Sequence, residues 1–417
     1  MTQSDTNNAV PGLNRRRFLW GGAATGVGAA TAALIGSSWK DASSTSAADQ
    51  ADHITPAIHG SATIPFHGRR QAGIDTPAQS HTVITALDLD RVQTAEQMVR
   101  LMRLLTDDAA RLTQGTAALA DPEPELATVP ARLTVTFGFG ERIVRLAGED
   151  SAPSWLKPLP AFSIDELDEQ QCGGDLLIHV ASEDLVTVSH AQRMLLKDTR
   201  SFGQVRWSME GFRRAFGSEG ASVTMRNLFG QVDGTANPQP GSDDLETVVW
   251  DSSNSPAWLS NGTSMVIRKI AMDLDTWDEL DRPGREESVG RYLTNGAPLT
   301  GRTEKDEPDF EKTTPLGFPV IAEFAHTRRA RSDVPGQRIF RRAYNYTTTP
   351  TGGPVSDAGL LFLSYQADVD RQFIPLQQRL DELDLLNQWT TPIGSAVFAI
   401  PPGCAEGGFI GDSLFAS

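Results

Sequence analysis

Strand and helix signals follow the same order in both halves of the chain, and this repetition constrains the fold more than any other feature of the sequence. Four segments of the first half are rich in β-branched residues or alternate apolar with polar residues, as strands do: 81–90, 131–140, 174–182 and 203–212. Helices are predicted between them, over 94–115 and from about 183 to 197. The order strand–helix–strand–strand–helix–strand is that of a ferredoxin-like α+β sandwich with an antiparallel sheet.

The helix predicted over 94–115 has a start signal and one apolar face. Thr94 is a suitable N-terminal cap, and Glu96 follows two positions later. The apolar residues recur at helical spacing: Met98, Leu101, Met102 and Leu105.

The second half repeats this order in part. Strands and helices alternate along it: strand 264–274, helix 277–291, strand 359–366, amphipathic helix 370–386 and strand 395–403. The run from Gly217 to Ser242 is rich in Gly, Asn and Pro and marks the boundary between the halves. We therefore expect two tandem ferredoxin-like domains, residues 63–220 and 221–417, whose sheets pack face to face. A pocket would lie where one sheet meets the irregular segments.

Composition narrows the classes of function. The chain has 417 residues, 39% of them hydrophobic, which is typical of a globular protein. Its formal net charge of −16 repels phosphate backbones, so nucleic acid is not expected as a partner. Cys172 and Cys404 form no CxxC pair, which argues against a cysteine metal site; they are either one disulfide or two separate buried thiols.

The N-terminus has the features of an export signal. Arginines precede a weakly apolar, Gly-rich run in NRRRFLWGGAATGVGAATAALIG, and Ser46-Ala47-Ala48 is an acceptable cleavage site, so residues 1–48 are the predicted signal peptide and 49–62 a lead-in. Arg-Arg-x-Phe-Leu resembles the twin-arginine signal, with an ordinary secretory signal as the alternative. The twin-arginine translocase carries folded proteins, often ones that hold a cofactor. We expect a location in the periplasm, the cell envelope or outside the cell.

Two segments carry residues suited to chemistry. GQVDGTANP, residues 230–238, holds Asp233 in a Gly-rich stretch, although Asp-Gly is also common in plain turns. His326 is followed by three arginines in EFAHTRRARSD. A lone histidine is most often a surface or core residue, but basic neighbours suit a ligand with carboxylates, such as the propionates of a porphyrin.

A third segment, RIFRRAYNY at 338–346, is strand-like and contains Arg341 and Arg342. Adjacent residues of a strand face opposite sides. Only one of these two arginines can therefore point into a pocket.

These three segments resemble dye-decolorizing peroxidases: the GxxDG motif, the stretch with the haem-ligating histidine and the segment with the distal arginine. Four other segments are similar to the same family: PFHGRRQAGIDTPAQSH (65–81), VGRYLTNGAPLTG (289–301), GLLFLSYQADVDRQFIPLQQRL (359–380) and GSAVFAIPPG (394–403). The resemblance spans residues 63–415. It best fits the exported branch that includes deferrochelatase-like proteins of iron-uptake operons.

The resemblance implies haem b, held mainly by the second of two ferredoxin-like halves. His326 would be the axial ligand of the haem iron, with Asp233 and Arg341 on the distal face. Gly234, Thr235 and Ala236 would bring the backbone close to the porphyrin, which requires small residues.

The chain departs from the family at Arg331, Ser332 and Asp333. The family usually has Asn-Pro-Arg there, at positions that would contact haem. Arg331 or Arg329 would then take the place of the usual arginine.

The implied reaction reduces hydrogen peroxide and oxidises bulky organic reductants such as dyes and phenolics. Asp233 would accept and return the proton that peroxide must move between its oxygens, and Arg341 would stabilise the developing charge. Asp384 is a candidate for the carboxylate that bonds the other nitrogen of His326.

Two alternatives remain. One is a deferrochelatase that releases iron from haem, with iron-uptake proteins as partners. The other is a non-catalytic haem carrier, which has no need of Asp233 and Arg341. Homo-oligomers are compatible with the sequence.

Bulky dyes do not fit such a pocket, so electrons would have to come through aromatic residues at the surface. The aromatic residues nearest to the site in sequence are Tyr344, Tyr346, Tyr365 and Trp389. For most of them, ordinary core packing is the favoured interpretation.

Export by the twin-arginine route can be tested at Arg15 and Arg16. Replacing both by Lys should trap the protein in the cytoplasm, because this pathway recognises the arginine pair. Cell fractionation followed by immunoblotting measures the outcome, with Arg17→Lys, at the variable position of the motif, as the control. Normal export of the double variant would point to the general secretory route.

Overall fold

The computed structural model describes residues 58–220, 222–251, 253–334 and 336–415. The predicted signal peptide, residues 1–48, and most of the lead-in lie outside the described residues. In the part of the chain that the structure describes, no helix is both long and apolar enough to cross a membrane.

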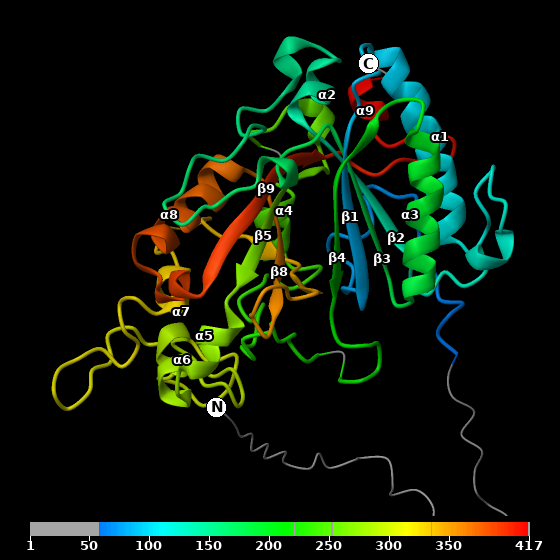
Figure 1. The fold of residues 1–417 in the computed structure, drawn as a ribbon. Helices are drawn as coiled ribbons and strands as arrows, with labels where there is room; N and C mark the ends of the chain where they lie inside the picture. The colour runs from blue at the N-terminus through cyan, green and yellow to red at the C-terminus, as the bar shows by residue number, and fades with distance from the viewer. Residues whose placement is uncertain (1–57, 221, 252, 335, 416–417) are drawn as a thin grey trace, which may run out of the picture. The chain divides into compact units, whose positions relative to one another are not determined.

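The first half contains the predicted ferredoxin-like unit. Its elements are β1 (His81–Asp88), α1 (Ala95–Thr113), β2 (Thr134–Phe139), α2 (Glu141–Arg145), β3 (Leu176–Ser182), α3 (Leu185–Thr199) and β4 (Gln204–Phe212). The strands are antiparallel in the order β2-β3-β1-β4. Figure 1 shows α1 and α3 side by side against this part of the sheet, where they bury one large apolar cluster.

Helix α1 begins where the sequence predicts. Thr94 caps it, but Gln97, not Glu96, completes the capping box by bonding back to the backbone N–H of Thr94. The predicted apolar face is fully buried: Met98, Leu101, Met102 and Leu105. Burial of this face holds the helix on the sheet, because most of the stability of a helix in a protein comes from packing of its apolar face.

The second half has the same plan with more irregular connections. Its elements are α4 (Asp243–Val249), β5 (Thr263–Met272), α5 (Leu274–Glu279), α6 (Arg282–Val289), α7 (His326–Arg329), β6 (Phe340–Arg341), β7 (Tyr344–Thr348), β8 (Asp357–Gln366), α8 (Ile374–Leu383), β9 (Thr390–Ile400) and α9 (Asp412–Phe415). Strand β5 lies between β8 and β9, antiparallel to both.

The helix predicted over 370–386 is not continuous. A π-helical turn, η5 (Val369–Phe373), precedes α8, and a 3₁₀ turn, η6 (Leu385–Gln388), follows it. Pro375 lies in the first turn of α8. Proline has no N–H to donate to the preceding turn, so the hydrogen-bond register changes there.

The two half-sheets face each other and are also joined at both edges. They enclose a shared apolar layer that includes Ile84 and Leu177 from the first half and Ile267 and Phe398 from the second. At one edge β2 pairs with β9, and at the other β4 pairs with β7. With β5 also paired to β8, the strands form one closed ring, which the face-to-face expectation had not included.

Buried arginines tie the halves together. Arg342 is 2% exposed and donates to the carbonyl oxygens of Ile74 and Thr76 and, at 2.6 Å, to Gln79 Oε1. Arg268 is equally buried and forms an ion pair with Asp165 of the first half. Removing one partner of such a pair leaves an uncompensated buried charge, so these contacts fix the relation of the two halves.

Both cysteines are free thiols, so the disulfide alternative is wrong. Burial, followed by the negative charge of Asp412, raises the pKa of Cys404 to about 11. The thiol is therefore protonated and unreactive at neutral pH.

Two acidic side chains meet where α3 packs on α1. Asp108 is 1% exposed, and Asp198 lies against it. Burial, then the hydrogen bond and the negative charge of Asp108, raise the pKa of Asp198 to about 7. Between pH 3.8 and about 7 the folded chain keeps a proton that the unfolded chain has released. The free energy of unfolding therefore falls as pH rises through this window.

Replacing Asp198 by Asn should remove this dependence. We expect the free energy of unfolding to rise by on the order of 1 kcal/mol at about pH 8, a modest gain because solvent partly screens the pair. The rise should be smaller at about pH 5, where Asp198 is already protonated in the folded chain. Urea unfolding at both pH values measures the effect. Asp107→Asn, at an exposed carboxylate of α1 next to Asp108, is the control. An equal gain at both pH values would contradict the shared proton.

Candidate active site

Asp233 and Arg341 form an ion pair between a glycine-rich turn and strand β6. Arg341 Nη1 lies 3.0 Å from Asp233 Oδ1, and the two side chains are 25% and 8% exposed. The backbone of the turn is fixed by a short antiparallel contact, in which Asp233 N–H donates to the carbonyl of Met225 at 2.8 Å. The plain-turn alternative for Asp233 therefore does not account for its side chain, which is nearly buried and holds a partly exposed cation.

A second donor reaches the other carboxylate oxygen of Asp233. Asn227 Nδ2 lies 3.4 Å from Asp233 Oδ2. The amide of Asn227 is oriented by its own oxygen, which accepts from the N–H groups of Phe229 and Gln231 at 3.1 and 3.2 Å. Both oxygens of Asp233 are thus held in place.

The residues that follow Asp233 turn sharply and bind a glutamate. Gly234 has φ of +119°, a conformation that side chains disfavour. Thr235 and Thr224 donate to Glu304 Oε1 at 2.9 and 2.6 Å, whereas Ala236 is exposed. Burial opposes ionisation of Glu304, but these hydrogen bonds outweigh it and lower its pKa. Glu304 is therefore ionised, and its carboxylate holds this turn through the hydroxyls of Thr224 and Thr235.

The neighbours Arg341 and Arg342 point to opposite sides of β6, as the strand alternation predicts. Arg341 reaches Asp233, and Arg342 reaches the segment 74–79. Only Arg341 can act at the site.

His326 is the first residue of α7, and its ring is oriented by a carboxylate. His326 Nδ1 lies 2.5 Å from Asp384 Oδ2, and Asp384 Oδ1 accepts from Leu386 N–H at 3.0 Å. The predicted contact between His326 and Asp384 is therefore present. With Nδ1 engaged, Nε2 is the nitrogen left for a metal.

The electrostatics place these groups in one site. Burial alone would lower the pKa of His326, but the charge and hydrogen bond of Asp384 outweigh it and raise the pKa above its ordinary value. The charges of Arg341 and Asp233 also act on His326. The structure thus brings together the histidine, the aspartate and the arginine that the sequence predicts.

The arginines near His326 have other partners. Arg329 donates to the carbonyl of Arg379 at 2.9 Å and to Glu382 at 2.8 Å, and Arg331 pairs with Glu307. Ser332 donates to Gln337 at 2.5 Å, and Asp333 is exposed. Arg331 is the more exposed of the two arginines and the better placed to exchange its partner for a ligand carboxylate.

The tyrosines near the site are not at the surface. Tyr344 and Tyr365 are fully buried, and Tyr346 is 4% exposed. All three lie in the apolar layer between the half-sheets. Core packing, the interpretation that the sequence favours for most of these aromatic residues, is confirmed for the three tyrosines, because strand alternation turns their side chains inward. Trp389 is half-buried.

The donor set fits a haem. Among the described residues no group of three His, Cys, Asp or Glu side chains could hold a bare metal ion. A single free imidazole nitrogen is the protein ligand that an iron porphyrin needs, because the porphyrin supplies the other donors. Partly buried Arg291 lies near Arg331 and Arg341 and adds positive charge suited to propionates.

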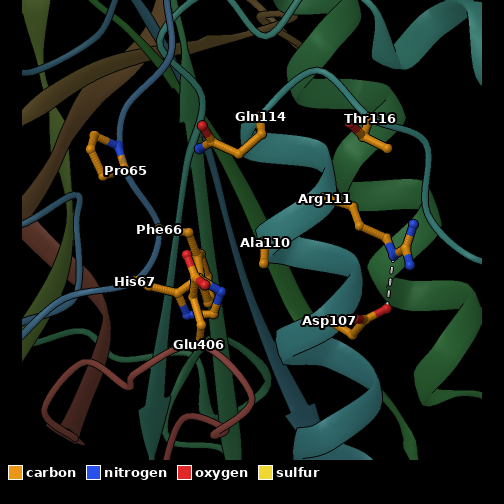
Figure 2. A pocket seen from close by; sticks show the side chains of 9 residues that line it. All are labelled: Pro65, Phe66, His67, Asp107, Ala110, Arg111, Gln114, Thr116 and Glu406. Atoms are coloured by element: carbon orange, nitrogen blue, oxygen red, sulfur yellow. Dashed lines mark hydrogen bonds and ion pairs between the residues drawn. The ribbon is translucent and has the colours of Figure 1, made fainter.

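A groove elsewhere takes no part in this site. It has a volume of about 400 Å³ and lies between α1, the segment 65–67 and Glu406 (Figure 2). Asp107 and Arg111 on its wall pair with each other at 2.9 Å. None of its lining residues belongs to the groups around Asp233, Arg341 and His326.

Comparison with known proteins agrees with this geometry. The family model "Dyp-type peroxidase, N-terminal" matches residues 71–213, and "Dyp-type peroxidase, C-terminal" matches residues 224–405. The chain is 35% identical to the dye-decolorizing peroxidase of Thermobifida fusca over 99% of each chain. It is 34% identical to the deferrochelatase of Escherichia coli K12, over 82% of this chain and 84% of that one.

Solved structures give the same result. A DyP-type peroxidase from Cellulomonas bogoriensis is 50% identical, with a TM-score of 0.83 over 87% of this chain and 100% of that one. Ferric DtpA from Streptomyces lividans is 39% identical, with a TM-score of 0.82 over 86% of this chain and 98% of that one. The family models, the relatives and the site agree, and the chain belongs to the Dyp-type peroxidase family.

Proposed function

We propose that this protein is a haem b peroxidase that reduces hydrogen peroxide with electrons from bulky organic reductants such as dyes and phenolics. The observation that carries the proposal is the partly buried Asp233–Arg341 pair, which acts electrostatically on the same histidine that Asp384 orients. A protein that only stores haem has no use for an aspartate and arginine held in this way. The pair therefore argues against the carrier alternative.

His326 would hold the haem through Nε2, and Asp384 would keep that nitrogen oriented and electron-rich. The relative from Streptomyces lividans is described as ferric and also as an oxyferrous complex, which supports an iron cofactor here. When bound, haem supplies an iron that takes up peroxide and accepts its oxidising equivalents.

Asp233 supplies the proton transfer. One of its oxygens accepts from Arg341 and the other faces Asn227, so the carboxylate is held in one orientation. It can take the proton from one peroxide oxygen and return it to the other, which makes the leaving group water. Arg341 stabilises negative charge on the departing oxygen.

Iron release from haem is a second candidate, because the chain is similar to a deferrochelatase over most of its length. The two activities have different products. Incubating the pure protein with haem and following free-porphyrin fluorescence, beside a peroxide-dependent dye assay, separates them. Porphyrin release without dye oxidation would favour the deferrochelatase.

The setting of the reaction is also a proposal. Export through the twin-arginine translocase would place the enzyme in the periplasm, the cell envelope or outside the cell, where iron-uptake proteins or further copies of the chain are candidate partners. The arginine pair of the leader supports it.

Substitution of the distal pair tests the peroxidase mechanism. Arg341→Leu should slow the reaction with peroxide by about 10²–10³-fold or more, because it removes the charge that stabilises the breaking bond. Asp233→Asn keeps the shape but loses the base, and a loss of about 10²–10⁴-fold is expected. Stopped-flow absorbance of the haem band measures both rates.

The exposed pair Asp107 and Arg111 is the matched control for the same two changes. Haem should stay bound in all variants, because His326 is unaltered. If both distal variants react at the wild-type rate, the assigned roles are mistaken.

The contact between Asp384 and His326 gives a test that does not depend on turnover. In haem-free Asp384→Asn the pKa of His326 should fall below its ordinary value, because burial then acts without the opposing carboxylate. Haem affinity should fall about 10- to 100-fold. NMR titration and haem binding measure the two effects, with Asp281→Asn, which alters the cap of α6, as control. An unchanged pKa would separate Asp384 from the histidine.

A further inference from the structure

We propose that Asn237 is a positioning residue that sets the geometry of the Asp233–Arg341 pair. Its side-chain amide forms hydrogen bonds with both backbone polar groups of Arg341, the N–H and the C=O. Nδ2 donates to the carbonyl oxygen of Arg341 at 2.7 Å, and Oδ1 accepts from the N–H of Arg341 at 3.0 Å. These two contacts fix which end of the amide is oxygen and which is nitrogen.

The amide takes the place of a neighbouring strand. On one side β6 pairs with β8, where Arg342 N–H donates to the carbonyl of Leu363 at 2.9 Å. The polar backbone groups of Arg341 face the opposite edge, because these groups alternate along a strand. Asn237 satisfies both of them and so fixes a two-residue strand that has little pairing of its own.

The same turn holds Arg341 twice. Asn237 N–H donates to the carbonyl of Gly234 at 3.0 Å, and the positive φ of Gly234 folds the chain back between them. Asp233 at one end of this turn contacts the guanidinium of Arg341, and Asn237 at the other end contacts its backbone. The turn from Asp233 to Asn237 and the residue Arg341 are thus joined at two points. The position of the Arg341 backbone therefore sets how closely its guanidinium approaches the carboxylate of Asp233.

The inference rests on the proposed function, because this arrangement matters for peroxide only if Asp233 moves the proton. Proton transfer and charge stabilisation depend steeply on distance, and a misplacement of about 1 Å is enough for a loss of about 10²-fold. Loss of the Asn237 contacts should therefore act through Asp233 and Arg341, not through haem binding.

Asn237→Ala removes both contacts. We expect the reaction with peroxide to slow by about 10- to 100-fold in the wild-type background. In the Arg341→Leu background the same change should have less than about a twofold effect, because the guanidinium that Asn237 positions is already lost. In a crystal structure of the haem-free variant, the separation of Arg341 Nη1 and Asp233 Oδ1 should exceed the present 3.0 Å.

Asn295→Ala is the matched control. Its amide also donates to a carbonyl, that of Arg302 at 2.9 Å, and accepts from an N–H, that of Ala297 at 3.1 Å, in an exposed loop without contact to Arg341. This variant should react with peroxide at the wild-type rate. If Asn237→Ala does not fold, Asn237→Asp goes through the same cycle; it keeps the acceptor and replaces the donor by a charged oxygen that faces the carbonyl of Arg341.

Two results would overturn the inference: an equal loss of rate in both backgrounds, or an unchanged ion pair in the variant crystal structure. Failure of the proposed function gives a different pattern. The wild-type protein would then not react with peroxide, while the crystal structures would still show whether Asn237 positions Arg341.

Discussion

The alternation of side chains along β6 is the constraint on which both the fold and the site depend. Arg341 points to one side and completes the ion pair with Asp233. Arg342 points to the other side and is buried among the carbonyl groups of residues 74–79 in the first half of the chain. One pair of neighbouring residues thus joins the two halves and supplies the cation of the site. A shift of this strand by one residue would exchange the two guanidinium groups and destroy both functions.

Much of the fold follows from local patterns. The apolar face of α1 and the β-branched segments of the first half predict its elements to within a few residues. When one face of a helix or strand is buried, its apolar residues recur in the sequence with the period of that element. The joining of the half-sheets cannot be read in this way. Phe139 pairs with Ala399, and Phe212 with Asn345, across large separations in sequence that no local period records. The break before α8 is local, and Pro375 gives its signal.

The candidate site was predictable where a residue carries its own signal. Asp233 and His326 stand in unusual segments, and strand geometry shows that Arg341 and Arg342 diverge. Asn227, Asn237 and Glu304 were missed because their role is to hold backbone or hydroxyl groups that come together only in the folded chain. Asn237 precedes a proline and reads as an ordinary turn residue, yet its partner lies 104 positions away.

The carboxylate of Asp384 has two tasks, since one oxygen holds His326 and the other caps η6. The imidazole is therefore confined to one rotamer by contacts within the polypeptide itself. The conformational entropy of that side chain is lost during folding and not when an iron is captured. A ligand prepared in this way binds with little reorganisation, so folding and cofactor loading can be separate events.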